Sequence, residues 1–172
     1  MIQSTYDFHM QQAGNTMNKL TSRSLAALAG FAILTGCATD NRGPAVEFLD
    51  PGTILPSGLP FSEAVRVNDT LYLSGMVGVL PGTLELAPGG IEEESRQTMD
   101  NIRMTLEAHG ASMDDVVKCT VMLADISEWG TFNEIYKTYF NGRFPARSAL
   151  GANGLALGAR VEVDCIAVIE KR

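Results

Sequence analysis

The stretch FPARSALGANGLALGARVEVDCIAV, residues 144–168, decides the fold and holds the most informative side chains of the chain. A proline turn precedes Arg147, an apolar strand follows it, and a second strand after a glycine-rich loop carries Glu162. A guanidinium among apolar neighbours needs an anionic partner, because an unpaired buried charge is costly. Its planar fork matches the carboxylate of a small ligand. The alternative is a structural ion pair from Arg147 to Glu162 or Asp164.

The rest of the chain alternates strand patterns with two helical patterns. A helix is predicted over residues 91–109, because Met99, Ile102 and Leu106 recur at helical spacing before a helix-ending Gly110. The other predicted elements are strands over residues 64–67, 71–77, 116–123, 146–152 and 159–169 and a helix over residues 127–140. The order ββαβαββ predicts an α+β fold, with one mixed sheet and two helices on one of its faces.

The two-residue period of the strands assigns side chains to faces. In the last strand the helices should cover an apolar face, and Glu162 and Asp164 share the opposite face. The last two strands are expected to pair across the loop between them, which would place Arg147 near both carboxylates. A partly apolar face without a cover predicts burial in an oligomer, so the site would lie at a subunit boundary. In the strand over residues 116–123, one face is predicted to carry Val117, Cys119, Val121 and Leu123.

The first 36 residues are predicted to be a leader that is separate from the folded domain. Met17 offers a second start, and Lys19 and Arg23 supply positive charge after it. Residues 25–34 form an apolar run that is too short to span a bilayer as a helix, which is typical of an export signal.

The leader ends in LTGC, residues 34–37, which resembles a bacterial lipobox and makes Cys37 the predicted site of lipidation. Several acyl chains would hold the protein at a membrane. Ala38 after the cysteine favours the outer membrane, on the periplasmic side of a bacterial envelope; without a functional leader the protein would be cytoplasmic. The predicted organisation is a leader over residues 1–36, a lipidated cysteine and tether over residues 37–60, and one domain over residues 61–172.

Charge and composition exclude several function classes. Without residues 1–36 the chain carries 11 basic and 19 acidic side chains, a net charge of −8, and no basic cluster, which argues against binding nucleic acid. His109 is the only histidine outside the leader, so no histidine-based metal site or catalytic triad can be assembled. The acidic run Glu92–Glu94 is interpreted as a solvated first helical turn.

Two cysteines remain in the domain once Cys37 is assigned to lipid. Cys119 and Cys165 each lie inside an apolar strand pattern and are interpreted as buried, inert thiols. A bond between them would be permitted in an oxidising periplasm, but the sequence does not place them within reach of each other.

With these elements placed, residues 61–171 resemble the RidA (YjgF, or endoribonuclease L-PSP-like) family of reactive-intermediate deaminases. The matching pieces are LYLSGMVG, RQTMDNI, VVKCTVML, TFNEIYKTYF and the stretch over residues 144–168. The resemblance implies a chorismate-mutase-like fold, a homotrimer with ligand clefts between subunits, and hydrolysis of 2-imino acids to 2-keto acids and ammonia without metal or cofactor.

The resemblance also implies roles for individual residues. Arg147 would bind the substrate carboxylate, and Glu162 would activate the attacking water as a general base. Ser74 and the backbone of Gly75 would contact the ligand, and Asn133 lies at a polar position near the cleft. Without the resemblance, Ser74 is interpreted as a strand-end hydroxyl and Asn133 as a helix-surface amide.

Three positions depart from the family pattern. Phe61, assigned to substrate binding, stands where many members have tyrosine, Met76 where glutamine is common, and Ala149 where several deaminases have cysteine. A second hypothesis is therefore a non-catalytic module in the cell envelope that binds a small carboxylate or a protein. Ribonuclease activity, a third, is disfavoured by the acidic charge.

Overall fold

The computed structural model describes residues 43–50, 52 and 54–170 and has the predicted α+β architecture. The predicted leader and Cys37 lie outside the described residues. Within this part of the chain, no helix combines the length and apolar character needed to cross a membrane.

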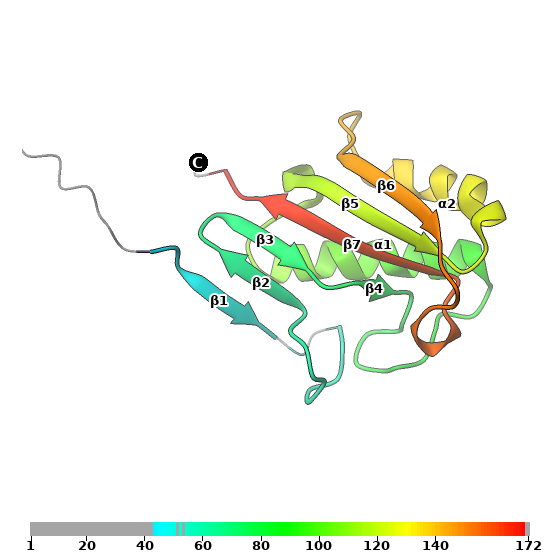
Figure 1. Ribbon diagram of the computed structural model, residues 1–172, viewed down its shortest axis with the longest axis horizontal. Coiled ribbons are helices and arrows are strands. Elements are labelled where there is room, and N and C mark those ends of the chain that lie inside the picture. Colours follow the sequence, from blue (N-terminus) through cyan, green and yellow to red (C-terminus); the bar gives the residue numbers. More distant parts are fainter. Residues whose placement is uncertain (1–42, 51, 53, 171–172) are drawn as a thin grey trace, which may run out of the picture. The chain divides into compact units, whose positions relative to one another are not determined.

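One seven-stranded mixed sheet carries both helices on the same face (Figure 1). The strand order is β1-β2-β3-β7-β5-β6, and β4 also pairs with β7. The strands are β1 (Val46–Leu49), β2 (Ala64–Val67), β3 (Thr70–Leu73), β4 (Met76–Val77), β5 (Val116–Leu123), β6 (Ala146–Gly151) and β7 (Val161–Val168). The helices are α1 (Ile91–Ala108) and α2 (Trp129–Tyr136), with 3₁₀ turns at Met113–Asp115, Ile126–Glu128, Lys137–Tyr139 and Ala156–Gly158.

The core lies between the helices and the sheet. The predicted stripe Met99, Ile102 and Leu106 of α1 is fully buried. The helix ends as the glycine predicts: Gly110 has a φ of 74°, its N–H donates to the Glu107 carbonyl, and the Ala111 N–H donates to the Leu106 carbonyl. This bonding satisfies the last carbonyls of α1 and directs the chain back towards the sheet.

The prediction that the last two strands pair with each other is wrong. β6 pairs in parallel with β5, with Arg147 opposite Cys119, and β5 separates β6 from β7. The reason is the helix between β5 and β6: a strand–helix–strand crossover returns the chain parallel to the strand it left, so β6 adds to the outer edge of β5.

Two other details of the strands differ from the prediction. A bulge between Val116 and Lys118 shifts the register of β5, so that Val116 is buried and Val117 is exposed, contrary to the predicted face. Beyond the bulge Cys119, Val121 and Leu123 share one face, as predicted, and are fully buried. The predicted strand over residues 71–77 is interrupted at residues 74–75, and β1 forms within the segment that was interpreted as a tether.

The two domain cysteines form a disulfide, which corrects their interpretation as inert thiols. Cys119 on β5 and Cys165 on β7 are directly paired across the antiparallel ladder, with their Cα atoms 4.1 Å apart. Both are buried under the helices, as the strand pattern predicted. The proximity was invisible in the sequence because it depends on the register between two strands 46 residues apart.

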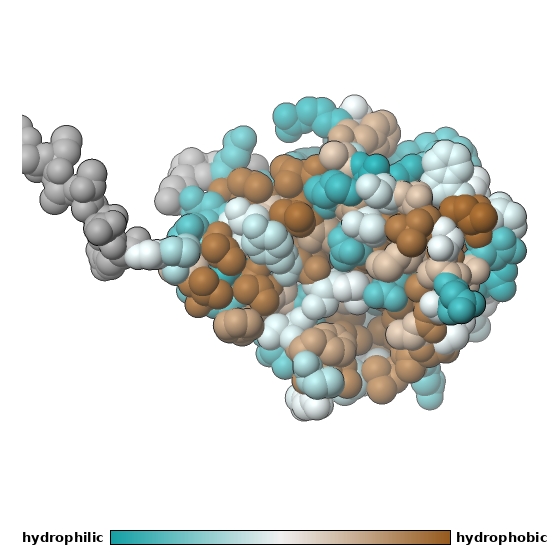
Figure 2. Space-filling view, viewed as in Figure 1, coloured by the Kyte–Doolittle hydropathy of each residue, from teal (hydrophilic) through white to brown (hydrophobic). Residues whose placement is uncertain are grey.

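The sheet face opposite the helices carries exposed apolar side chains. Figure 2 shows apolar surface at the left of this face, over the region of β1 to β3. The exposed residues on these and neighbouring strands include Val46, Phe48, Tyr72, Leu150 and Val168. An open apolar face of this kind is typical of a surface that is buried on assembly.

Candidate functional site

The arginine half-site is formed by α2 and β6. The face of α2 towards Arg147 carries Trp129, Asn133 and Tyr136, which recur at four- and three-residue spacing and so lie on one side of the helix. Asn133, Tyr136 and Arg147 line one cavity of approximately 450 Å³, and Arg147, Trp129 and Ala149 line another beside it.

The guanidinium of Arg147 is oriented by neutral groups. Its Nη2 donates to Oδ1 of Asn133 at 2.7 Å, and its Cζ lies 4.5 Å from the ring centroid of Tyr136 and 5.9 Å from that of Trp129. Burial raises the pKa of Tyr136 to about 12, although the charge of Arg147 acts in the opposite direction, so the ring stays neutral and attracts the cation.

One arm of the Arg147 guanidinium has no partner in the part of the chain that the structure describes. There the buried Nη1 makes no hydrogen bond, and no carboxylate forms an ion pair with Arg147. The alternative of a structural pair with Glu162 or Asp164 is therefore wrong. A buried guanidinium N–H without an acceptor is costly, which leaves a place for an external anion.

The glutamate half-site is formed by loops around β4 and the beginning of β7. Phe61, Ser74, Gly75 and Glu162, all predicted site residues, line a cavity of approximately 430 Å³. Burial raises the pKa of Glu162 above its ordinary value of 4.5, and the nearby negative charge of Asp164 raises it further.

Gly75 makes room for the carboxylate of Glu162. A Cβ at residue 75 would lie 2.1 Å from Oε1 of Glu162, a distance that no side chain can occupy. Ser74 is fixed at the end of β3, because its N–H donates to the Glu63 carbonyl and its Oγ donates to the Ser62 carbonyl. Ser74 thus has the strand-end hydrogen bonding that was interpreted without the resemblance, and its contact with a ligand stays a prediction.

Hydrogen bonds from α1 hold β4 in place beside Glu162. The Asn101 amide, buried in α1, donates to the carbonyls of Val77 and Val79 at 3.1 and 2.9 Å. Val77 in turn is the β4 partner of Glu162. The position of β4 in the glutamate half-site is therefore fixed by buried hydrogen bonds from α1, and not by the surrounding loops alone.

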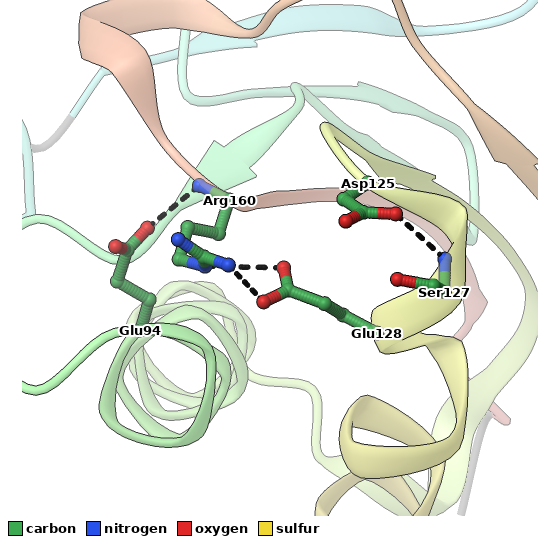
Figure 3. Close-up of polar contacts among 5 residues, drawn as sticks. All are labelled: Glu94, Asp125, Ser127, Glu128 and Arg160. Carbon is green, nitrogen blue, oxygen red and sulfur yellow. Dashed lines mark hydrogen bonds and ion pairs between the residues drawn. The ribbon is translucent and has the colours of Figure 1, made fainter.

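The start of β7 is fixed by a second polar cluster (Figure 3). The Arg160 N–H donates to Oε2 of Glu94 at 2.8 Å, and the Arg160 guanidinium forms a two-pronged ion pair with Glu128. Asp125 accepts a hydrogen bond from the Ser127 N–H and so begins the turn that carries Glu128. Glu94 is buried, so the interpretation of Glu92–Glu94 as a fully solvated turn is wrong at its third residue.

The two half-sites do not meet within one chain. Arg147 lies on the sheet face that the helices cover, as does its partner Cys119, whereas Glu162 alternates with the buried Val161 and Val163 and faces the other side. The Cα atoms of Arg147 and Glu162 are separated by two strand spacings across the sheet and by three residues along the strand direction, which gives a distance of about 14 Å. The predicted proximity of Arg147 and Glu162 in one chain is therefore wrong.

Comparison with known proteins identifies the family. The model of the endoribonuclease L-PSP family matches residues 54–169. The chain belongs to this family. The mouse 2-iminobutanoate/2-iminopropanoate deaminase is 50% identical over 109 residues, which cover 63% of this chain and 81% of the mouse protein. The chloroplastic Reactive Intermediate Deaminase A of Arabidopsis thaliana is 39% identical over 157 residues, which cover 91% of this chain and 80% of the plant protein.

Solved structures of the family share the fold. The crystal structure of RidA from the Antarctic bacterium Psychrobacter sp. is 33% identical and superposes with a TM-score of 0.67, covering 72% of this chain and 99% of that one. This similarity agrees with the single α+β sheet layer described above and with the resemblance inferred from the sequence.

In this endoribonuclease L-PSP family member, sequence reasoning missed two groups of site residues. Trp129 and Tyr136 flank Arg147, and their helical spacing from Asn133 was a signal that could have found them. Leu59, Leu84 and Leu157 line the Glu162 cavity from three separate loops. No periodic pattern connects these leucines, so only the folded structure brings them together.

Proposed function

We propose that the protein hydrolyses 2-imino acids to 2-keto acids and ammonia in clefts formed between copies of the chain. The observation that carries this proposal is the buried Nη1 of Arg147, which has no hydrogen-bond partner among the described residues, together with a partly buried Glu162 whose pKa is raised. One half-site is suited to an anion and the other to a base. The deaminase names of the mouse and Arabidopsis relatives support the same reaction.

Arg147 binds the carboxylate of the substrate in this mechanism. Asn133 already holds Nη2, and the Tyr136 ring supports the plane of the guanidinium, so a carboxylate oxygen completes the set by accepting from Nη1. Because the arginine is oriented before the substrate arrives, little conformational entropy is lost on binding.

Glu162 acts as the general base. Its carboxylate takes a proton from a water molecule while the water oxygen attacks the imine carbon, and the electron pair of the C=N bond moves to nitrogen, which is protonated. The protonated Glu162 supplies the proton to this nitrogen. In the resulting carbinolamine the hydroxyl proton passes through Glu162 to the amino nitrogen, the C–N bond breaks, ammonia leaves, and the C=O bond of the 2-keto acid forms. The raised pKa of Glu162 makes it a stronger base than an ordinary carboxylate.

A complete site requires a second copy, because one chain holds the two half-sites on opposite faces of its sheet. We propose the homotrimer that the family resemblance implied. The exposed edge strand β6 and the apolar open face of the sheet supply surface for such an assembly.

A coupled assay tests the reaction. An amino acid oxidase would generate 2-imino acid in the presence of the purified protein, and imine loss would be followed by trapping with semicarbazide. We expect accelerated decay with the wild-type protein and none with Arg147→Ala or Glu162→Gln. If the wild type were no faster than Arg147→Ala but still bound a small 2-keto acid, the binding-module hypothesis would replace the enzymatic one.

Mixing inactive variants tests the shared cleft. Co-expressed Arg147→Ala and Glu162→Gln chains would place an intact arginine of one copy beside an intact glutamate of another in about a quarter of clefts, if copies combine at random in a head-to-tail ring. Activity should therefore return in the mixture. Two inactive variants that stay inactive together, while still assembling, would place the site within one chain.

We also propose that the mature protein is lipid-anchored in the bacterial envelope through Cys37. The Cys119–Cys165 disulfide supports this location, because such bonds persist in the oxidising periplasm and are rare in the cytosol. Metabolic labelling with a palmitate analogue should mark the wild type but not Cys37→Ser. Equal labelling, or a wild-type protein recovered wholly in the soluble fraction, would argue against the anchor.

A further inference from the structure

Four apolar side chains surround the candidate base, and we call them the leucine wall: Leu59, Leu84, Leu157 and Phe61. They come from three loops, after β1, after β4 and after β6, and line the cavity that also holds Glu162. Figure 2 shows apolar surface at the lower margin of its view, where Figure 1 places these loops. Phe61, Leu84 and Leu157 are each about half exposed, which is unusual for large apolar residues brought together at one place.

The loop that carries Leu84 is held by its own hydrogen bonds. The Thr83 Oγ1 donates to the Leu80 carbonyl at 2.8 Å, and the Gly82 N–H donates to the Ile54 carbonyl at 2.9 Å. The second bond ties this loop to the loop that carries Leu59. The wall is thus formed before a ligand arrives, which lowers the entropic cost of binding.

Leu157 is held in an unfavourable backbone conformation. Its φ is 59°, in the left-handed region that a bulky residue rarely adopts. Hydrogen bonds from the N–H groups of Gly158 and Ala159 to the carbonyls of Leu155 and Ala156 close the turn around it. Strain at an exposed leucine does nothing for the core, which indicates a role for the side chain at the site.

Polar groups in this cavity are few. Among the described residues that line it, Glu162 is the only one with an ionisable side chain, and the hydroxyl of Ser74 already donates to the Ser62 carbonyl. A substrate side chain placed here meets the leucine wall and, apart from the Glu162 carboxylate, no charged group among the described residues. The cavity of approximately 430 Å³ is larger than a methyl group needs.

We propose that the preferred substrates are 2-imino acids with large apolar side chains, such as those derived from leucine or phenylalanine, and that Leu84 and Leu157 determine this preference. The proposal rests on the function proposed above: Arg147 of one copy holds the carboxylate, Glu162 of another faces the imine carbon, and the wall beside Glu162 receives the side chain. Burial of an aliphatic chain on these leucines removes apolar surface from water.

Two imine substrates generated by the same oxidase test the preference for large apolar side chains. D-amino acid oxidase supplied with D-leucine or D-alanine generates a large or a small 2-imino acid under the same conditions. We expect the wild type to have a kcat/KM roughly 10-fold or more in favour of the leucine-derived imine, because apolar pockets discriminate by about this factor or more per added group. The double variant Leu84→Ala/Leu157→Ala should lose about 10-fold on the large imine and stay within about twofold on the small one.

The loop offers a matched control. Leu80 lies in the same loop as Leu84 but outside the lining of this cavity, so Leu80→Ala should leave the preference unchanged. Leu157→Gly separates selectivity from folding, because glycine relieves the positive φ: we expect a higher Tm together with a weaker preference for the large imine.

Three results would overturn the proposal. A wild type that favours the alanine-derived imine, or a double variant that loses both imines equally, would remove the selectivity, while the proposed function stands. A changed oligomeric mass of the double variant in sedimentation would make the leucine wall an interface between copies. If no imine were hydrolysed at all, the proposed function would fail, and titration of the wild type with 4-methyl-2-oxopentanoate and pyruvate would still test the wall, which should bind the larger acid more tightly.

Discussion

The arginine half-site is carried by regular elements, α2 and β6, whereas the glutamate half-site is gathered from loops around β4 and β7. In the first, one helical face orients Arg147 through Asn133 and Tyr136. In the second, Glu162 depends on the absence of a side chain at Gly75. Both half-sites fix the position of a charged side chain, the first through contacts from a helix and the second through the space left at a glycine.

This difference suggests that the two half-sites have different roles in binding the substrate. Every 2-imino acid has the same carboxylate, so the group that binds it can stand on rigid elements. The side chain of the substrate varies, and loops can change their lining without disturbing the sheet. The arginine half-site would then set binding in general and the glutamate half-site would set chemistry and selectivity.

The largest effect is expected at the arginine half-site. Arg147→Ala should lower kcat/KM roughly 10³-fold, because removing one partner of a buried ion pair leaves the substrate carboxylate uncompensated, which costs about 3–5 kcal/mol. Arg147→Lys should recover only part of this loss, since an ammonium cannot present a planar fork. Steady-state kinetics in the coupled assay measure both variants. The exposed Arg143 supplies the control, and an Arg143→Ala variant as damaged as Arg147→Ala would contradict the assignment.

A large loss of stability is expected when the disulfide between the two half-sites is removed. Cys119 pairs with Arg147 on one side and with Cys165 on the other, so the disulfide joins the strand next to the arginine to the strand that carries Glu162. Closing a loop with a sequence separation of 46 stabilises the folded state by about 4 kcal/mol in the chain-entropy model.

Reduction under native conditions, or the double variant Cys119→Ala/Cys165→Ala, should therefore lower the midpoint of chemical denaturation. In a Cys37→Ser background, the variant Cys119→Ala tests the pairing, because it should release one free thiol, at Cys165, on unfolding. Two titratable thiols in the denatured, unreduced Cys37→Ser protein would show that the bond is absent.

The half-sites also differ in how far the sequence could predict them. The alternation in β7 and the stripe of α1 follow from periodicity, and they gave the faces of Glu162 and of the core correctly. Arg147 was singled out because a cation between apolar residues is conspicuous in a sequence. What periodicity could not supply was the neighbour of β6: the crossover through α2 inserts β5 and moves Arg147 to the other face.

Long-range register explains most of the remaining differences. The bulge at Val116 and Lys118 reverses the face of Val117, and the pairing of Cys119 with Cys165 is a property of two strands, not of either one. The leucine wall is a still weaker signal, because its members are isolated apolar residues in three loops. Loop residues become a site only when the sheet has fixed the ends of the loops.

Gly75→Ala should separate chemistry from binding. The added Cβ would displace the Glu162 carboxylate, and a misplaced base should lower kcat by roughly 10²-fold, within the range that general-base catalysis contributes. KM should change little, because the arginine half-site is untouched. Gly130→Ala in α2 is the matched control, since nothing lies within 4 Å of the added Cβ. A rise in KM with unchanged kcat would mean that Gly75 serves binding only.

The smallest effect is a shift in pH dependence at the glutamate half-site. Burial first, and the charge of Asp164 second, raise the pKa of Glu162 above 4.5. A general base works only when ionised, so kcat/KM should fall as the pH drops through this raised pKa. Asp164→Asn removes the like charge and should move the acidic limb of the pH–rate profile to lower pH. Asp114→Asn, on an exposed turn remote in the fold from this cavity, should leave the limb in place.

The raised pKa of Glu162 also affects the stability of the fold. As the pH rises, this group should lower stability, whereas it should increase kcat/KM. Between 4.5 and the raised pKa the folded state binds more protons than the unfolded state, so this group contributes a loss of stability as the pH rises through that window. Above the window the cost is fully present, and Glu162→Gln should raise the Tm at neutral pH while abolishing catalysis. Well below pH 4.5, where the carboxyl is protonated in both states, the variant and the wild type should melt at nearly the same temperature. A Glu162→Gln protein that is less stable than the wild type at neutral pH would show that Glu162 is held by favourable contacts, and the loop half-site would then be built for rigidity as the helical one is.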